Sequence, residues 1–592
     1  MPKEKKKEKI LKGIPASPGI AIGPSLIIGD LLSTIVISED DIPSSEIPEE
    51  LERLEQAIQK TKEEISKLQE EASTSLAKSE TRIFDVHLLI IDDKVLLTDV
   101  KKIISSGKQA DYAFTKVINE YIERIENLSN SYIRERSSDI KDVASRLLSN
   151  LTGTKKRSLK NITGQHIIVA NDLSPSETVE IDRNKLLAFI AEKGSRTSHT
   201  AILAQSLKIP AIVGVQGLLK EIEDDDLIII DAFTGVIIIN PTEKTLEIYP
   251  KKKKENELLY ATLLKESNLR PETRDGFCIQ LAANIESTDD IKDANKFGAA
   301  GVGLFRTEYI FMNIPNLPTE EDQFNIYREA AAMLNGRPLV IRTLDLGGDK
   351  LSDNFKMPIE PNPFLGLRAI RLCLNKPELL EPQIRAILRA SVFGDIHIMF
   401  PMISTEFEVD QVLEIIKKAK TDLIAKGIPF NNNLKVGIMI EIPAAALIAE
   451  KLAKKVDFFS IGTNDLLQYT IAVDRCNANV SYLYQPTHPA VLRLIDYVVR
   501  AARKNNVWVT VCGEMASDPI NTPILAGLGV NELSMAPVSL GSVRRVIRRI
   551  KMHEAEEIAK ASLECSNFNE VLTLSENYLC EIVPDLMDLR IG

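Results

Sequence analysis

The second half of the chain alternates between short apolar runs and longer segments whose apolar residues recur at helical spacing. Beyond Asp275 eight such runs can be distinguished. Strands that alternate with helices predict parallel βα units, and eight units over about 270 residues predict a closed (β/α)8 barrel of the TIM type. The predicted strands are Cys278 to Ile285, Gly301 to Phe305, Leu339 to Leu344, Ile396 to Met402, Val436 to Ile440, Val456 to Ile461, Val507 to Val511 and Glu532 to Met535.

The first half of the chain has a different pattern. Over residues 51–148 the apolar positions form one helical stripe, with glutamate and lysine on the other faces, which predicts antiparallel helices. Turn-rich residues 13–24 precede this segment and strand-like runs such as 166–170 and 227–231 follow it. A small α/β domain interrupted by a helical domain is therefore expected, and the charged segment 250–274 is interpreted as a linker. The predicted domains are residues 1–30 and 151–249 (α/β), 31–150 (helical), 250–274 (linker) and 275–592 (barrel).

Charge and composition narrow the function classes. The formal net charge is −11, which disfavours a general nucleic-acid-binding protein. There is no run of 18 apolar residues and no apolar stretch of a signal peptide near the start, so no membrane insertion and a cytoplasmic location are expected. The six cysteines show no metal-ligand spacing and no disulfide framework, and reduced thiols are expected.

Polar residues stand at or just past the ends of the predicted barrel strands. The carboxyl ends of barrel strands form the rim where barrel enzymes carry out their chemistry. One such residue is compatible with an ordinary loop, but the coincidence at six strand ends favours a catalytic rim. These residues are Asn284, Arg306, Arg342, Glu441, Asn464 with Asp465, and Cys512 with Glu514.

Three arginines at this rim predict an anionic substrate. Arg306, Arg342 and Arg475 carry planar guanidinium groups that suit phosphate and carboxylate oxygens. Arginines that converge without matching acids repel one another unless an anion joins them, so a small, multiply anionic substrate is expected. Lys350 can add a further positive charge.

Two acids at the same rim predict a metal site. Glu441 and Asp465 supply hard oxygen ligands at neighbouring strand ends. One or two carboxylates together with substrate oxygens are the usual ligands of Mg²⁺. The alternative is that these acids only balance the charge of the arginines.

Cys512 ends the seventh predicted strand and has two interpretations. A cysteine at a strand end is often a small buried apolar residue. At a catalytic rim its thiol can instead donate a proton to an enolate-like product, because its pKa is tunable around neutral pH.

His199 is the candidate for a covalent intermediate. It lies in the turn Gly194-Ser-Arg-Thr-Ser-His199, which opens into an apolar-periodic segment. The orphan N–H groups and positive dipole at a helix N-terminus favour an imidazole that accepts a phosphoryl group, and Arg196 adds positive charge. The alternative is a capped helix start with a buried, hydrogen-bonded histidine.

Six motifs occur together and in a fixed order. They are Gly194-Ser-Arg-Thr-Ser-His199, Gly303-Leu-Phe-Arg-Thr-Glu308, Arg342-Thr-Leu-Asp-Leu-Gly-Gly-Asp-Lys350, Asn362-Pro-Phe-Leu-Gly-Leu-Arg368, Asp457-Phe-Phe-Ser-Ile-Gly-Thr-Asn-Asp465 and Cys512-Gly-Glu514. From about Gly13 to beyond Met535 the chain resembles the phosphoenolpyruvate-protein phosphotransferases, the Enzyme I family of the bacterial sugar phosphotransferase system. The helical segment, through residues 132–140, is similar to the part of that family that docks the carrier protein HPr.

The resemblance implies a role for each rim residue. His199 would take the phosphoryl group of phosphoenolpyruvate and pass it to a histidine of an HPr-like carrier, and Cys512 would protonate the enolate to give pyruvate. Glu441 and Asp465 would bind Mg²⁺. The substrate would be held by Arg306, Arg342, Asn464, Asp465 and Arg475. The family's α/β domain swivels between barrel and helical domain, and its members dimerise through the barrel, so a homodimer is expected.

Two departures and two rival functions accompany the resemblance. Residues 231–235 carry alanine and a bulky side chain where many relatives have glycine, and Cys476 follows Arg475 where glycine is common. A pyruvate phosphate dikinase or phosphoenolpyruvate synthase shares the Thr-Ser-His segment, but it needs a nucleotide-binding domain, and no glycine-rich phosphate loop precedes residue 190. A non-catalytic regulator that senses phosphoenolpyruvate is the second rival.

Overall fold

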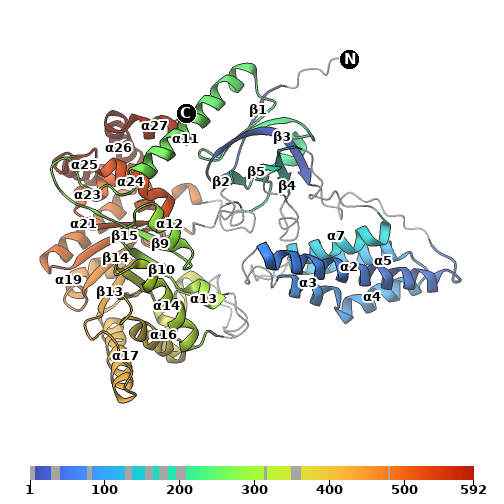
Figure 1. The fold of residues 1–592 in the computed structure, drawn as a ribbon, viewed down its shortest axis with the longest axis horizontal. Coiled ribbons are helices and arrows are strands. Elements are labelled where there is room, and N and C mark those ends of the chain that lie inside the picture. Colours follow the sequence, from blue (N-terminus) through green and yellow to red (C-terminus); the bar gives the residue numbers. More distant parts are fainter. Residues whose placement is uncertain are drawn as a thin grey trace. The chain divides into compact units, whose positions relative to one another are not determined.

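A computed structural model of the protein describes most of the chain (Figure 1). The described residues are 7–28, 41–75, 83–126, 137–153, 164–171, 185–194, 204, 209–312, 317–347, 360, 362–475, 477 and 480–591. Two compact units, Met1–Asn256 and Glu257–Gly592, can be separated. Within the described ranges, no helix is both long enough and apolar enough to cross a membrane.

The first unit contains a sheet built from both sides of the helical segment. Its strand order is β1-β8-β7-β3-β4-β5-β6-β2. β3 runs parallel to β4, with Ser25 opposite Ile167, so strands that are far apart in the sequence pair directly. This pairing confirms the predicted α/β domain with an inserted helical segment. The strands are β1 (Lys9–Lys12), β2 (Ile14–Ser17), β3 (Ile20–Ile28), β4 (His166–Ala170), β5 (Leu186–Ala191), β6 (Ala211–Val213), β7 (Leu227–Asp231) and β8 (Val236–Ile239), with the short helix α10 (Leu218–Glu221).

The inserted segment is helical, as its apolar stripe predicted. Its described helices are α2 (Ile47–Ser75), α3 (Ile83–Ile91), α4 (Lys94–Ser105), α5 (Ala110–Glu126) and α7 (Ser137–Thr152). Leu54, Ile65, Phe114 and Leu148 are almost fully buried in a common core. Asp93 starts α4, because its side chain accepts hydrogen bonds from backbone N–H groups of the first turn.

The turn after β7 shows how residues 231–235 are accommodated. Gly235 has a φ of +75°, and a Cβ there would lie 2.4 Å from the Gly13 carbonyl oxygen, so glycine is required at this position. Ala232 is buried and Phe233 is exposed. The buried Asp231 carboxylate forms an ion pair of 3.0 Å with Lys252 of α11 (Glu243–Lys265). The alanine and phenylalanine therefore fit this turn without displacing its one essential glycine.

The second unit is a closed barrel of eight parallel strands, which confirms the predicted (β/α)8 fold (Figure 1). The strands are β9 (Gln280–Ile285), β10 (Val302–Arg306), β11 (Leu339–Arg342), β12 (Ile396–Phe400), β13 (Lys435–Ile440), β14 (Phe458–Gly462), β15 (Trp508–Cys512) and β16 (Glu532–Met535). Predicted and observed ends coincide or differ by one or two residues. The run after β11 continues apolar because Leu344 is buried in the core of the unit. β12 ends two residues before Met402, which adopts a φ of +59°.

Helices follow the strands and bury one face each against the barrel. Thr319 begins α14 (Glu320–Leu334) and Thr405 begins α17 (Glu406–Ala425), each with a capping box. The helices of this unit are α12 (Asp290–Lys296), α13 (Glu308–Met312), α14 (Glu320–Leu334), α15 (Ala369–Asn375), α16 (Pro377–Ala390), α17 (Glu406–Ala425), α18 (Pro443–Leu447), α19 (Ala449–Leu452), α20 (Thr463–Ile471), α21 (Pro489–Lys504), α22 (Glu514–Ser517), α23 (Thr522–Leu528), α24 (Leu540–Ile547), α25 (Met552–Glu564), α26 (Phe568–Ile582) and α27 (Pro584–Ile591).

Candidate active site

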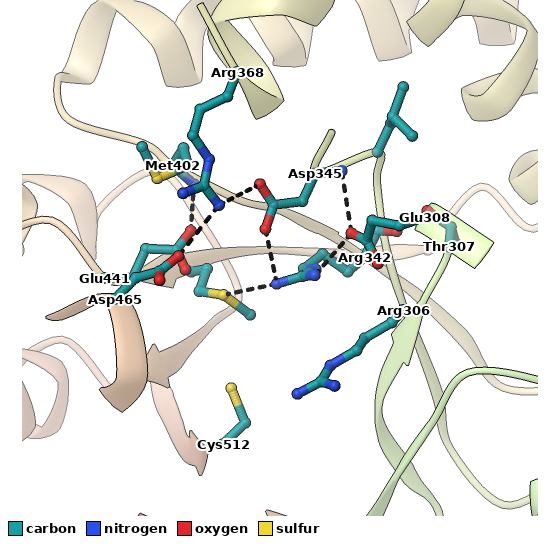
Figure 2. A network of polar contacts seen from close by, with 12 residues as sticks. Arg306, Thr307, Glu308, Arg342, Asp345, Arg368, Met402, Glu441, Asp465 and Cys512 are labelled. Carbon is teal, nitrogen blue, oxygen red and sulfur yellow. Dashed lines mark hydrogen bonds and ion pairs between the residues drawn. The ribbon is translucent and has the colours of Figure 1, made fainter. Parts of the chain in front are cut away.

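The carboxyl ends of the barrel strands bring five of the predicted residues to one rim (Figure 2). Arg306, Arg342 and Cys512 are the last residues of β10, β11 and β15. Glu441 directly follows β13, and Asp465 lies in the first turn of α20 after β14. All eight strands run in the same direction, so side chains from distant parts of the sequence meet at this end.

Arg342 is held by two acids in the interior of the site. Its Nη2 donates to Glu308 Oε1 at 2.7 Å, and its Nη1 lies 3.2 Å from Asp345 Oδ2. Burial alone would lower the pKa of Arg342, but Glu308 and Asp345 raise this pKa above its ordinary value. Arg342 is therefore a fixed positive charge with a fixed orientation.

Arg368 belongs to the same network and was not among the residues predicted for the site. Its Nη2 donates to Asp345 Oδ1 at 2.9 Å and to Asp465 Oδ2 at 3.3 Å. It therefore links the acid that holds Arg342 to the acid predicted to bind metal (Figure 2). The motif 362–368 was noted in the sequence, but it lies in a loop region away from any strand end, so the strand-end pattern gave no signal for Arg368.

The charge balance corrects one argument made from the sequence. The expectation that the arginines converge without matching acids is wrong, because Glu308 and Asp345 pair with Arg342. In the buried network two guanidinium groups, of Arg342 and Arg368, face four carboxyl groups, of Glu308, Asp345, Glu441 and Asp465. The interior of the site is therefore richer in acid than in base. This excess of carboxyl groups favours a cation in the interior.

The two predicted metal ligands lie on the acidic side of this network. Glu441 Oε1 accepts a hydrogen bond of 2.6 Å from the Met402 N–H. Burial, followed by the neighbouring Asp465 and Asp345, raises the pKa of Glu441 to about 8. Asp465 Oδ1 is buried without a hydrogen-bond partner, and Arg475 Nη1 lies 3.8 Å from it. Asp465 therefore balances part of the charge of the arginines, as the alternative interpretation has it. Its Oδ1 atom is still available to a metal ion.

Cys512 is enclosed beside the network. Cys512 is 2 % exposed, and its side chain packs with Met439 and Phe458 inside the barrel. The Ser460 hydroxyl donates to Cys512 Sγ at 3.3 Å, and the thiol donates to the Ile461 carbonyl oxygen at 3.5 Å. Burial raises the pKa of the Cys512 thiol above its usual value. The thiol is therefore protonated at neutral pH, as a proton donor must be.

The remaining predicted residues are placed less centrally or not described. Arg306 Nη1 pairs with Glu286 Oε1 at 2.8 Å, and its side chain is 38 % exposed. Asn464 Oδ1 accepts a hydrogen bond from the Glu514 N–H at 3.1 Å. The Asn464 side-chain NH₂ group can still donate to another partner. His199, Lys350 and Cys476 lie outside the described residues.

Family models match the chain in three consecutive blocks. Residues 12–136 match the N-terminal domain of PEP-utilising enzymes, residues 162–235 their mobile domain, and residues 261–552 their PEP-binding domain. The last block contains the whole barrel and every described residue of the rim. These matches define the class: the chain is a PEP-utilising enzyme.

Curated relatives define the family more narrowly. A phosphoenolpyruvate-protein phosphotransferase of Listeria monocytogenes is 42% identical over 574 residues, which cover 97% of this chain and 100% of the relative. Relatives of the same name from Bacillus sp. (strain S) and Staphylococcus aureus (strain MSSA476) are 44% and 42% identical over 78% and 81% of this chain, and over 80% and 83% of their own length. The chain belongs to the family of phosphoenolpyruvate-protein phosphotransferases, and it is a transferase that moves a phosphoryl group from phosphoenolpyruvate to protein.

Proposed function

We propose that the chain transfers the phosphoryl group of phosphoenolpyruvate to His199 and then to a histidine of an HPr-like carrier protein, releasing pyruvate. The observation that carries this proposal is the rim of the barrel, where oriented arginines, an acidic pair and a protonated thiol meet. The reaction would be the first step of a phosphotransferase system.

The exposed and the buried arginines would contact different parts of the substrate. Phosphoenolpyruvate carries a phosphate and a carboxylate, both of which match the fork of a guanidinium group. The side chains of Arg306 and Arg475 are 38 % and 34 % exposed, so they can reach ligand oxygens from the rim. Arg342, which Glu308 holds in place, would direct its positive charge toward the substrate from the interior of the site. The Asn464 side-chain NH₂ group would add a hydrogen-bond donor. Lys350 remains a further candidate.

Glu441 and Asp465 would hold Mg²⁺. The fit rests on the unpartnered Asp465 Oδ1 and on the excess of carboxyl groups, which raises the pKa of Glu441. In the described part of the chain no group of three or more His, Cys, Asp or Glu is arranged around one metal position. Water and substrate oxygens would complete the coordination, as is usual for this ion. A bound Mg²⁺ would stabilise negative charge on the transferring group.

The chemical step divides between two side chains. A neutral imidazole nitrogen of His199 forms a bond to phosphorus while the bond between phosphorus and the enol oxygen breaks. The resulting enolate takes a proton at carbon from the Cys512 thiol, which yields pyruvate and a thiolate. Protonation at carbon makes return to the enol unfavourable. The equilibrium of the reaction therefore shifts toward pyruvate and the phosphorylated histidine.

The proposal includes the predicted domain roles. Residues 31–150 would dock the carrier, residues 1–30 and 151–249 would carry His199 between its two partners, and residues 275–592 would bind the substrate and form the homodimer. A histidine that serves two sites needs such a motion. The cytoplasmic location expected from the sequence is part of the same proposal.

A labelling experiment tests the function as a whole. Phosphoenolpyruvate labelled in its phosphoryl group is mixed with the full-length protein and Mg²⁺, with and without a histidine-containing carrier. We expect one label per chain without the carrier, transfer of that label when the carrier is added, and one pyruvate for each label. Chelation of Mg²⁺ is expected to stop labelling of the protein and formation of pyruvate. Pyruvate formed without any protein-bound label would contradict the proposal, since it would show hydrolysis instead.

A further inference from the structure

Beneath the rim, the interior of the barrel has an apolar part and a polar part. Leu304, Val340, Met399, Met439 and Phe458 form an apolar interior cluster with Cys512. Other inward positions of β14, β15, β16 and β9 carry polar side chains. These are Ser460, Thr510, Glu532, Ser534 and Asn284. A polar stripe therefore runs inside the barrel beneath the rim.

The register of the strands places these polar residues side by side. Ser460 pairs with Thr510, and Thr510 pairs with Glu532. Cys512 pairs with Ser534, one inward position nearer the rim. Since inward positions alternate with outward ones, the side chains of Ser460, Thr510 and Glu532 share the same space inside the barrel.

Glu532 is a carboxyl group for which the phosphoryl transfer described above has no use. It is the first residue of β16, at the end of the barrel opposite to the rim, and it keeps some exposure to solvent. Its Oε1 accepts a hydrogen bond of 3.1 Å from the Thr510 hydroxyl. Burial raises the pKa of Glu532 to about 7. The residues that face it, Thr510 on β15, Gln280 on β9 and Gly303 on β10, carry no charge.

Cys512 needs a proton source after every turnover. Once the thiol has protonated the enolate, a thiolate remains at a position that is 2 % exposed. A buried thiolate is unfavourable, because burial raises the pKa of this group. Its nearest hydroxyl is that of Ser460, which already donates a hydrogen bond to the sulfur.

We propose that Glu532 is a proton reservoir that reloads Cys512 through Thr510 and Ser460. The proposal rests on the function proposed above. The O–H bond of the Glu532 carboxylic acid breaks and the proton passes to the Thr510 hydroxyl oxygen, whose own proton moves to a water molecule between Thr510 and Ser460. That water protonates the Ser460 oxygen, and the former Ser460 proton joins the Cys512 sulfur. The net result is a Glu532 carboxylate and a Cys512 thiol, and solvent at the far end of the barrel returns a proton to Glu532.

This arrangement separates the supply of protons from the substrate. The substrate and the phosphoryl acceptor occupy the rim during the reaction, while Glu532, which is partly exposed, lies at the opposite end of the same barrel. Cys512 can therefore be reloaded before the rim has been emptied. Glu532 does not touch the reacting atoms, so its effect appears only when more than one turnover is required.

The test compares the first turnover with later ones in a Glu532→Gln variant of the full-length protein. Glutamine keeps an oxygen for the Thr510 hydrogen bond but has no acidic proton. In rapid-mixing experiments with phosphoenolpyruvate and Mg²⁺, the first pyruvate per site is expected at the wild-type rate, because Cys512 starts protonated. With saturating carrier, the steady-state rate of pyruvate release is expected to fall by about tenfold or more. Thr510→Val is expected to give the same split, and Glu532→Asp a partial recovery.

The pH profile gives a second readout. The reservoir is loaded below the pKa of Glu532 and empties as the pH rises through about 7, so the wild-type steady-state rate is expected to fall across this range. The Glu532→Gln variant is expected to lose that inflection. Glu450→Gln, which changes an exposed glutamate paired with Lys504 on the outside of the barrel, is the matched control and is expected to behave as wild type.

The outcomes are distinct. Equal rates in Glu532→Gln and wild type, in both phases, would overturn the reservoir. Equal losses in both phases would also overturn it, because they would show that Glu532 only supports the structure around Cys512. If the wild-type protein itself forms no pyruvate in the first turnover, the proposed function fails instead.

Discussion

A Cys512→Ala variant is expected to fold normally and to release pyruvate about 10²- to 10⁴-fold more slowly than the wild type, the usual contribution of a general acid. The thiol is protonated at neutral pH, because burial raises its pKa, and it is directed into the site (Figure 2). Alanine leaves the arginine network intact, so binding of phosphoenolpyruvate is expected to change little. Steady-state pyruvate release and the substrate dissociation constant are the two measurements.

A second buried cysteine provides the control for this prediction. Cys373 is fully buried in α15, where it packs in the apolar core of the barrel unit and donates to the Leu344 carbonyl oxygen at 3.9 Å rather than to a rim side chain. Cys373→Ala removes the same atom and leaves a comparable cavity, with some loss of stability expected and no loss of turnover. If Cys512→Ala released pyruvate as fast as Cys373→Ala, the general-acid role would be refuted.

The second large effect is expected at Arg342. Arg342→Gln leaves Glu308 and Asp345 without their guanidinium partner in a buried site. Removing one member of a buried ion pair typically costs about 3–5 kcal/mol, because the remaining charge stays buried and unpaired. We expect the free energy of unfolding of the barrel to fall by about that amount in urea titrations, together with loss of phosphoryl transfer.

Arg306→Gln separates the structural effect from the catalytic one. Arg306 pairs with Glu286 on the exposed edge of the rim, and such pairs contribute under about 1 kcal/mol. This variant is expected to lose activity with almost unchanged stability. If the free energy of unfolding of Arg342→Gln fell by less than about 1 kcal/mol, this would contradict the structural role assigned to the buried network.

The barrel could be predicted because its signal is local. Apolar runs and helical periodicity each extend over one element, and the closed parallel fold then fixes which strand ends meet. Glu441 and Cys512 could be found for the same reason, since each directly follows a predicted apolar run, and Arg342 and Asp465 lie within four residues of the end of one. Strand ends differ from the predicted ones by at most two residues, for example where the apolar run of β11 continues to the buried Leu344.

The charge partners could not be predicted, because they depend on how loops fold over the rim. Glu308 and Asp345 belong to segments after two different strands, and nothing in their spacing shows that both turn back to Arg342. Arg368 reaches Asp345 and Asp465 from a loop without a strand signal. The balance of charge, and with it the acidic character of the interior, is therefore a property of the fold and not of the motif order.

The labelling of His199 is the most direct test of the central claim, that one histidine carries the phosphoryl group. Wild-type protein and a His199→Ala variant are incubated with phosphoryl-labelled phosphoenolpyruvate and Mg²⁺, and the label is followed through acid and base treatment. We predict an acid-labile, base-stable label on the wild type and none on His199→Ala. Unchanged labelling of His199→Ala would contradict the account.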